Sequence, residues 1–139
     1  MGQLRYGPRP AIDREVTATK IGAWSTSLTA TFLTDPAVVA AVLPPPLEPP
    51  EEPLVKVSIS RVDLGGGRPP FGAGTFAVAA RHRDTEGFYP LLMPMTTEQA
   101  VIGGRETFGE PKKLAEIDLD IGEGLDGPTT VSGTVRRLG

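Results

Sequence analysis

The alternation of apolar and polar residues is the clearest pattern in the chain, and it predicts a protein built mainly from β-strands. Between residues 24 and 32, apolar side chains such as Trp24, Leu28 and Phe32 alternate with serines and threonines. This period of two is typical of a half-buried strand. The same period returns, with varying strength, in residues 54–62, 75–83, 87–95, 114–122 and 129–138. The pattern therefore predicts roughly six strands.

The strands at residues 75–83 and 87–95 are separated by the polar turn "DTEG", which predicts a hairpin. In the second of them, simple alternation places Tyr89, Leu91, Met93 and Met95 on one face. The stretch "DLGGGRPPFGAG", residues 63–74, precedes this hairpin and is predicted to be a loop. Its glycines do not indicate a phosphate-binding turn, because prolines stand where a helix should begin.

Two short helices are predicted between the strands. "TDPAVVAAVL", residues 34–43, has Asp35 at the N-cap and Pro36 at the first helical position, where a missing N–H costs nothing. "TTEQAVIGGRE", residues 96–106, begins with a capping box from Thr96 to Gln99 and should break at its two glycines. The proline-rich residues 44–53 are expected to be a stiff connector rather than a ligand for a polyproline-binding domain, because no basic residue flanks them.

This count of elements predicts an α+β domain, mainly antiparallel β and barrel-like, over residues 1–139. Residues 1–20 show no sustained period and are expected to form an N-terminal arm. Because the chain stops on a strand-like segment, the sheet is expected to be incomplete, with an edge that awaits a partner.

Composition removes most candidate chemistries. The net charge of −3 gives no reason to expect nucleic acid or an anionic membrane as a partner. The sequence holds no cysteine and one histidine, His82, so a zinc site of the usual kind is excluded and no metal is expected. The sequence shows neither a signal peptide nor a membrane-spanning run, so a cytoplasmic protein is the default expectation.

The remaining chemistry-bearing feature is a pair of adjacent lysines, Lys112 and Lys113, in "GGRETFGEPKKLAEI". A lysine amine can attack a ketone to form an iminium, which withdraws electrons and allows loss of CO2 or C–C bond cleavage without any cofactor. The attacking amine must be neutral, whereas an ordinary lysine has a pKa of about 10.4. Burial and a neighbouring ammonium can both lower such a pKa, and burial should contribute more here because neighbours on a strand point to opposite faces.

The same stretch resembles the signature of the acetoacetate decarboxylase family, which carries Gly-Arg-Glu, a short spacer and Pro-Lys-Lys-Leu. The similarity extends upstream over an early strand, a short helix and a proline-rich connector, and it spans roughly residues 23–117. It implies a β-rich cone or barrel, incomplete in this chain, in which Lys112 forms the Schiff base and Lys113 is its electrostatic neighbour. The implied protein is a carbon–carbon lyase acting on a small β-keto acid such as acetoacetate, and further copies of the chain are expected as partners.

The resemblance also suggests residues around the lysines. Arg105 and Glu106 are expected to hold the lysine loop near the substrate. The candidate pocket walls are Phe71, Phe76, Tyr89 and Met93.

Three positions depart from the family's decarboxylases, which bring an arginine and two glutamates into the pocket. Alignment by eye places Ser25, Ser58 and Ala73 there. This opens two alternatives: a pyruvate aldolase-dehydratase that uses the same lysine, and a non-catalytic protein that binds small molecules.

Which lysine lies inside is ambiguous in the sequence. Simple alternation places Lys113, and not Lys112, on the face of Ala115 and Ile117. The resemblance favours Lys112, and the two agree if Pro111 delays the strand until after Lys112. We therefore expect Lys112 to be the nucleophile.

Overall fold

A computed structural model describes residues 22–122 and 130–137 of the chain. The expected N-terminal arm at residues 1–20 lies outside the described residues, as does the connection at 123–129. The elements follow one another as β1 (Trp24–Leu33), α1 (Pro36–Val42), β2 (Leu54–Asp63), β3 (Phe71–His82), β4 (Thr85–Met95), α2 (Glu98–Phe108), β5 (Lys112–Gly122) and β6 (Thr130–Arg137).

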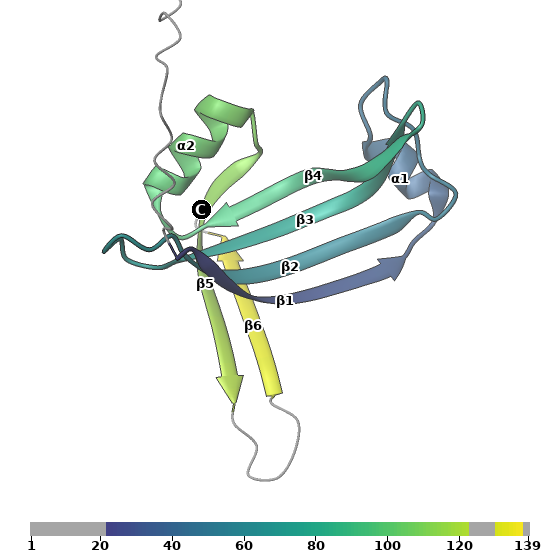
Figure 1. The fold of residues 1–139 in the computed structure, drawn as a ribbon. Coiled ribbons are helices and arrows are strands. Elements are labelled where there is room, and N and C mark those ends of the chain that lie inside the picture. The colour runs from purple at the N-terminus through teal and green to yellow at the C-terminus, as the bar shows by residue number, and fades with distance from the viewer. Residues whose placement is uncertain (1–21, 123–129, 138–139) are drawn as a thin grey trace, which may run out of the picture.

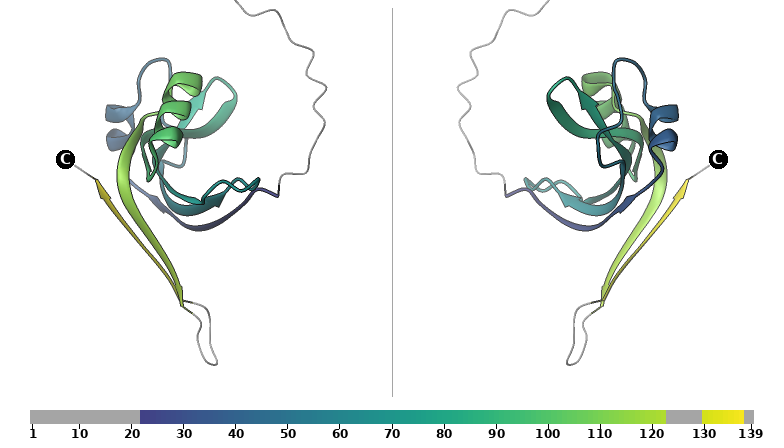
Figure 2. Two further views of the ribbon diagram at one scale, coloured as in Figure 1. Left: turned by 90° about the vertical axis from the view of Figure 1, so that its left-hand side faces the viewer. Right: turned by 90° about the vertical axis from the view of Figure 1, so that its right-hand side faces the viewer.

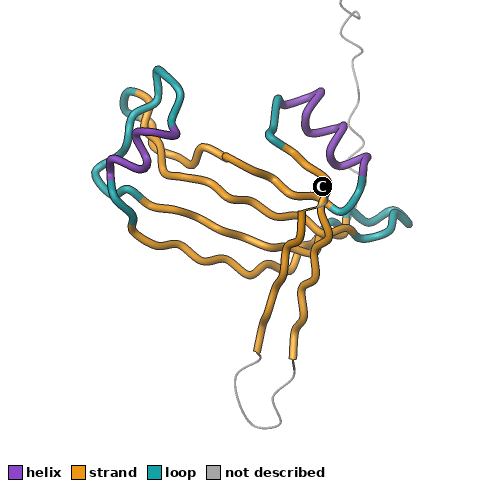
Figure 3. The backbone as a smooth tube through the Cα atoms, turned by 180° about the vertical axis from the view of Figure 1, so that it is seen from behind, coloured by secondary structure: helices purple, strands orange, loops and turns teal. Residues whose placement is uncertain are grey.

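The strands form a six-stranded sheet in sequence order, β1 to β6 (Figure 1). Every neighbouring pair is antiparallel except β4 and β5, which are parallel. A parallel pair needs a crossover connection, and α2 provides it. The sheet curls into an incomplete half-barrel when viewed along its edge, and the β5–β6 ribbon leaves it at a steep angle (Figures 2 and 3). The predicted fold class is confirmed.

The small core lies where α1 packs against the sheet. Val39 of α1 and Leu43, the residue that caps its end, form a buried cluster with Val55 of β2 and Val78 of β3, and Tyr89 of β4 packs against this cluster. Val39 is fully buried.

The start of α1 follows the sequence prediction. The carboxylate of Asp35 accepts a hydrogen bond from the backbone N–H of Ala37 at 2.8 Å, and Pro36 occupies the first turn. The proline-rich residues after α1 connect it to β2. The predicted cap, helix and connector are therefore confirmed.

Strand β3 begins at Phe71, so the prediction that residues 71–74 belong to a loop is wrong. Two glycines in this stretch allow other chain segments to come close. A Cβ on Gly72 would lie 2.9 Å from Cβ of Ile117, and one on Gly74 would lie 2.7 Å from a ring carbon of Pro94. These glycines serve close packing within the sheet rather than a turn.

The expected common face of Tyr89, Leu91, Met93 and Met95 is interrupted. Tyr89 pairs with Val78, but the register between β3 and β4 shifts by one residue next to Phe76. A bulge of this kind reverses which side chains share a face on either side of it. Tyr89 therefore faces the core beside α1, while Met93 and Met95 face the opposite side of the sheet.

Helix α2 also departs from the prediction at both ends. Its N-cap is Thr97, whose hydroxyl accepts a hydrogen bond from the N–H of Ala100, and not Thr96. It continues through Gly103 and Gly104 and ends at Gly109, which has a left-handed conformation with φ of 68°. The expected break was inferred from helix propensity alone, whereas the close packing of Gly104 described below requires a glycine within the helix.

Candidate functional site

The end of α2 is closely tied to the loop that carries the lysine pair. The backbone N–H of Gly109 donates to the carbonyl of Arg105 at 3.1 Å, and the N–H of Glu110 donates to the carbonyl of Gly104 at 3.3 Å. This is the hydrogen-bond pattern of a glycine-terminated helix. These hydrogen bonds fix the position of the backbone at the start of residues 110–112.

The other side of this loop is fixed to the sheet. The N–H of Met93 in β4 donates to the carbonyl of Pro111 at 3.1 Å, and Lys112 then pairs with Met93 in the parallel ladder. The guanidinium of Arg105 donates to the carbonyl of Lys112 at 3.4 Å. Arg105 of the Gly-Arg-Glu motif therefore contacts the Pro-Lys-Lys motif directly, and Gly104 contacts Glu110, the residue before that motif.

The side chain of Lys112 is 15% exposed, and its amine lies 2.7 Å from Oε2 of Glu110. That oxygen is buried and makes no hydrogen bond of regular geometry, so its contact with the amine is an ion pair. Gly104 lies directly against the lysine, because a Cβ there would overlap Cδ of Lys112 and Oε2 of Glu110. Lys113, by contrast, is exposed.

Sequence reasoning missed Glu110 as a site residue. The signal was available, because residues two apart on an extended chain point to the same side. Glu110 and Lys112 have that spacing, on either side of Pro111. This spacing brings the carboxylate and the amine to the same side of the loop, and the contacts with α2 and β4 hold the loop in place.

The ladder shows which positions share a face with Lys112. Met93 pairs with Lys112, Met95 pairs with both Leu114 and Ala73, and Ala73 pairs with Ser60. Directly paired residues point to the same side of a sheet. We call this side of the sheet the lysine face.

Two further positions belong to the lysine face by the same register. Ser58 alternates with Ser60, and Ser25 pairs with Val62, the residue two beyond Ser60. The hydroxyl of Ser60 is 2.7 Å from that of Ser27. Thus Ser25, Ser58 and Ala73, the three departures noted in the sequence, all lie on the lysine face.

Of the predicted pocket walls, Met93 is paired with Lys112, and Tyr89 lines a separate hollow together with Glu110 and Pro111. Tyr89 packs in the core cluster with α1. Phe76 is 40% exposed and points away from the lysine face, being three residues from Ala73 in an unbroken part of β3. Glu106 is an exposed residue of α2.

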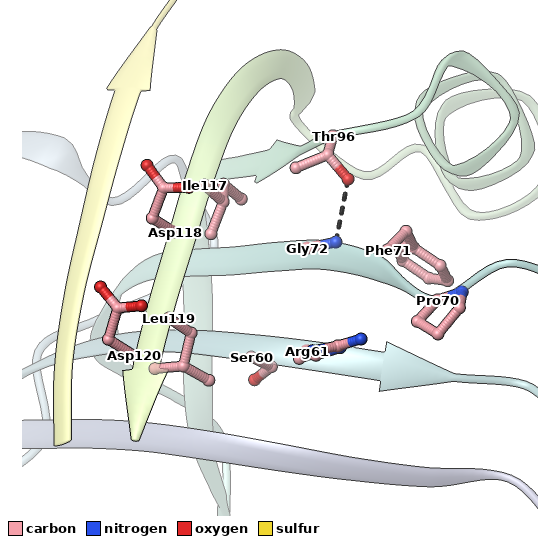
Figure 4. Close-up of a pocket in the computed structure, with 10 residues that line it drawn as sticks. All are labelled: Ser60, Arg61, Pro70, Phe71, Gly72, Thr96, Ile117, Asp118, Leu119 and Asp120. Carbon is pink, nitrogen blue, oxygen red and sulfur yellow. Dashed lines mark hydrogen bonds between the residues drawn. The ribbon is translucent and has the colours of Figure 1, made fainter. Parts of the chain in front are cut away.

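Phe71 lies on the lysine face but lines a hollow elsewhere, at the junction of β2, β3 and β5. The hollow has a volume of about 360 Å³ and is lined by Ser60, Arg61, Pro70, Phe71, Gly72, Thr96, Ile117, Asp118, Leu119 and Asp120 (Figure 4). The hydroxyl of Thr96 accepts a hydrogen bond from the N–H of Gly72 at 2.9 Å across its rim. Neither lysine lines this hollow. Among the described residues, no group of acidic or histidine side chains could hold a metal.

No helix in the described part of the chain is long and apolar enough to span a membrane. The two helices have 7 and 11 residues.

Comparison with known proteins identifies the class to which this fold and lysine loop belong. The family model for acetoacetate decarboxylase matches residues 7–139. The chain therefore belongs to the acetoacetate decarboxylase family, and the resemblance in its sequence is confirmed.

Individual relatives agree with this assignment. Acetoacetate decarboxylase 1 of Bradyrhizobium diazoefficiens is 35% identical over 91 residues, which cover 66% of this chain and 36% of the relative. The crystal structure of acetoacetate decarboxylase from Legionella pneumophila superimposes with a TM-score of 0.61 at 30% identity, over 68% of this chain and 37% of that one.

A more distant neighbour shares the fold alone. The enduracididine biosynthesis enzyme MppR, solved with a condensation product of pyruvate and imidazole 4-carboxaldehyde, has a TM-score of 0.60 at 15% identity, over 76% of this chain and 43% of that one. The chain thus spans well under half the length of these three proteins.

Proposed function

We propose that this chain carries the nucleophilic lysine of a lyase that forms a Schiff base with a small β-keto acid, such as acetoacetate, and releases CO2 from it. The observation that carries the proposal is the Lys112 amine, mostly buried and held at a fixed position by the family's two motifs. Relatives named acetoacetate decarboxylase support the substrate class.

The proposed reaction uses the amine as its only covalent catalyst. Neutral Nζ of Lys112 attacks the ketone carbon, and the resulting carbinolamine loses water to give an iminium. The iminium accepts the electron pair of the breaking C–C bond when the β-carboxylate leaves as CO2. A proton then converts the enamine into a second iminium, and water releases the ketone and restores Lys112.

Each neighbouring residue has a distinct proposed role. Arg105 positions the lysine through its hydrogen bond to the Lys112 carbonyl. Met93 and Met95 provide an apolar floor on the lysine face, where Met95 is 3% exposed. Lys113 points to the other face, so as an ammonium it acts on Lys112 only at a distance.

The second candidate function is a pyruvate aldolase-dehydratase that uses the same lysine. The lysine face favours this candidate at the positions of Ser25, Ser58 and Ala73, which offer no guanidinium or carboxylate to a substrate. Hydroxyl groups can hold a keto acid by hydrogen bonds, but they do not neutralise its carboxylate as a guanidinium does or transfer protons as glutamate does.

Borohydride trapping tests the proposal. The protein is incubated with acetoacetate or with pyruvate, reduced, and analysed by peptide mass spectrometry, while CO2 release is followed separately. We expect an adduct at Lys112, its loss in Lys112→Ala, and only partial reduction in Lys113→Ala. An adduct with acetoacetate accompanied by CO2 supports the decarboxylase, and an adduct with pyruvate alone supports the aldolase-dehydratase.

Two outcomes contradict the proposal. An adduct that persists in Lys112→Ala and disappears in Lys113→Ala would show that Lys113, and not Lys112, is the nucleophile. A folded wild-type protein that forms no adduct with either keto acid favours the non-catalytic binding protein.

A further inference from the structure

Glu110 occupies a position that the proposed reaction does not use. Its Oε2 is buried, yet the one charged group within ion-pair distance of it among the described residues is the Lys112 amine at 2.7 Å. The side chains of Lys112 and Glu110 are 15% and 29% exposed, so the ion pair is partly removed from water and each charge constrains the position of the other. The carboxylate therefore fixes where the lysine amine rests.

The surroundings hold the carboxylate in place. The N–H of Glu110 donates to the Gly104 carbonyl at 3.3 Å, and its carbonyl accepts a hydrogen bond from the N–H of Lys112 at 2.7 Å. Gly104 leaves room for both side chains only because it has no Cβ. The pair is thus enclosed by α2 on one side and by its own loop on the other.

The other charged groups near the pair do not replace it. Arg105 of α2 directs its guanidinium to the Lys112 carbonyl. Lys113 is exposed and lies on the opposite face of β5, and β4 presents the uncharged Met93. Within the described residues, Glu110 is the one ion-pair partner of Lys112.

We propose that Glu110 is a positioning residue that holds the Lys112 amine beneath α2 by an ion pair, so that the pair must open before the amine can attack. The inference that Glu110 controls attack by the amine rests on the proposed function, because it applies only if Lys112 is the nucleophile. The geometry on which it stands does not depend on the substrate.

The test measures the reactivity of each lysine without any substrate. Trinitrobenzenesulfonate labels neutral amines, and peptide mass spectrometry gives the ratio of labelling at Lys112 to labelling at Lys113 in one sample. Glu110→Gln keeps the size of the side chain and removes its charge. We expect this ratio to rise about two- to fivefold at pH 7, which corresponds to about 0.4–1 kcal/mol for a partly exposed ion pair.

Two variants serve as controls. Glu110→Asp restores the charge on a shorter side chain and should give an intermediate ratio. Glu116→Gln removes a carboxylate from an exposed position of β5 and should leave the ratio unchanged. Circular dichroism of every variant establishes that each one is folded.

The outcomes separate this inference from the proposed function. An unchanged or lower ratio in folded Glu110→Gln overturns the role of Glu110, whatever the trapping experiment shows. Should Glu110→Gln not fold, the ratio in Glu110→Asp decides, and a ratio equal to that of the wild type overturns the inference. Failure of the wild type to trap a keto acid overturns the proposed function and leaves the labelling result intact.

Discussion

Replacing Gly104 by alanine should displace the Lys112 amine, and the adjacent Gly103 offers a matched control. Both glycines lie inside α2. A Cβ on Gly104 would overlap Cδ and Nζ of Lys112, whereas one on Gly103 would meet nothing within 4 Å. The two substitutions therefore change the helix in the same way and differ in what they do to the lysine.

The expected magnitudes follow from these contacts. Alanine is more favourable than glycine inside a helix by about 0.5–1 kcal/mol, and this gain applies to both variants. Overpacking a close contact costs about 1–3 kcal/mol, and the flexible lysine should keep the cost near the lower end of this range. We expect Gly103→Ala to raise the free energy of unfolding by about 0.5–1 kcal/mol above that of the wild type. The free energy of unfolding of Gly104→Ala should be about 1–2 kcal/mol lower than that of Gly103→Ala.

Urea unfolding followed by circular dichroism measures the two free energies. Amine labelling of the folded proteins then reports the position of Lys112, which should become more reactive in Gly104→Ala and stay unchanged in Gly103→Ala. Equal stabilisation by both alanines, together with wild-type labelling of Lys112 in both, would refute the close packing of Gly104 against the lysine.

Three further predictions concern the fold around the site, each read from urea unfolding. Val39→Ala should lower the free energy of unfolding by about 2 kcal/mol, because Val39 is fully buried. Val38→Ala, at a site 54% exposed, should change it by less than about 0.5 kcal/mol, and equal effects would contradict the placement of the core. Gly72→Ala should lower the free energy of unfolding by about 1–3 kcal/mol, while Gly87→Ala, with nothing near its Cβ, should not lower it. A tolerated Gly72→Ala would mean that Ile117 of β5 does not pack against Gly72. Asp35→Ala should cost about 1 kcal/mol by removing the cap of α1, and no loss would show that α1 does not depend on it.

Side-chain alternation located the strands because successive side chains of an extended chain lie on opposite faces, although all of β6 is exposed and Ala77 to Ala80 of β3 are buried in a row. The period of two marks such strands wherever it is unbroken, and the structure has strands at all six predicted places among its described residues. It failed at the bulge beside Phe76, where one additional residue in β4 separates the face of Tyr89 from that of Met93. Nothing in the local sequence requires that residue, because the bulge depends on how β3 and β4 pair.

The glycines were misinterpreted for a related reason. In the sequence, Gly72 and Gly104 predict a loop and a helix break, which are the local preferences of glycine. In the structure each lies inside a regular element, and each is needed because a distant residue comes too close for a Cβ. Ile117 approaches Gly72, and Lys112 approaches Gly104. A single sequence does not contain these tertiary contacts in readable form.

For the two lysines, the alternation of side chains along β5 is predicted correctly, but the reason given for choosing Lys112 is wrong. Alternation placed Lys113 with Ala115, and this is right, since β5 is continuous from Lys112 and Ala115 is 4% exposed. The expectation that Pro111 delays the strand is wrong, because pairing with β4 begins at Lys112 itself. Yet Lys112 is the more buried of the two lysines. The alternation argument assumes that a strand has one buried face along its whole length, and β5 does not. At its first residues, α2 covers β5 on the lysine face. From Ala115 onward, the more buried residues of β5 lie on the opposite face. The position of α2, set by its glycine cap and by the hydrogen bond from Arg105, therefore decides which lysine is enclosed with a carboxylate.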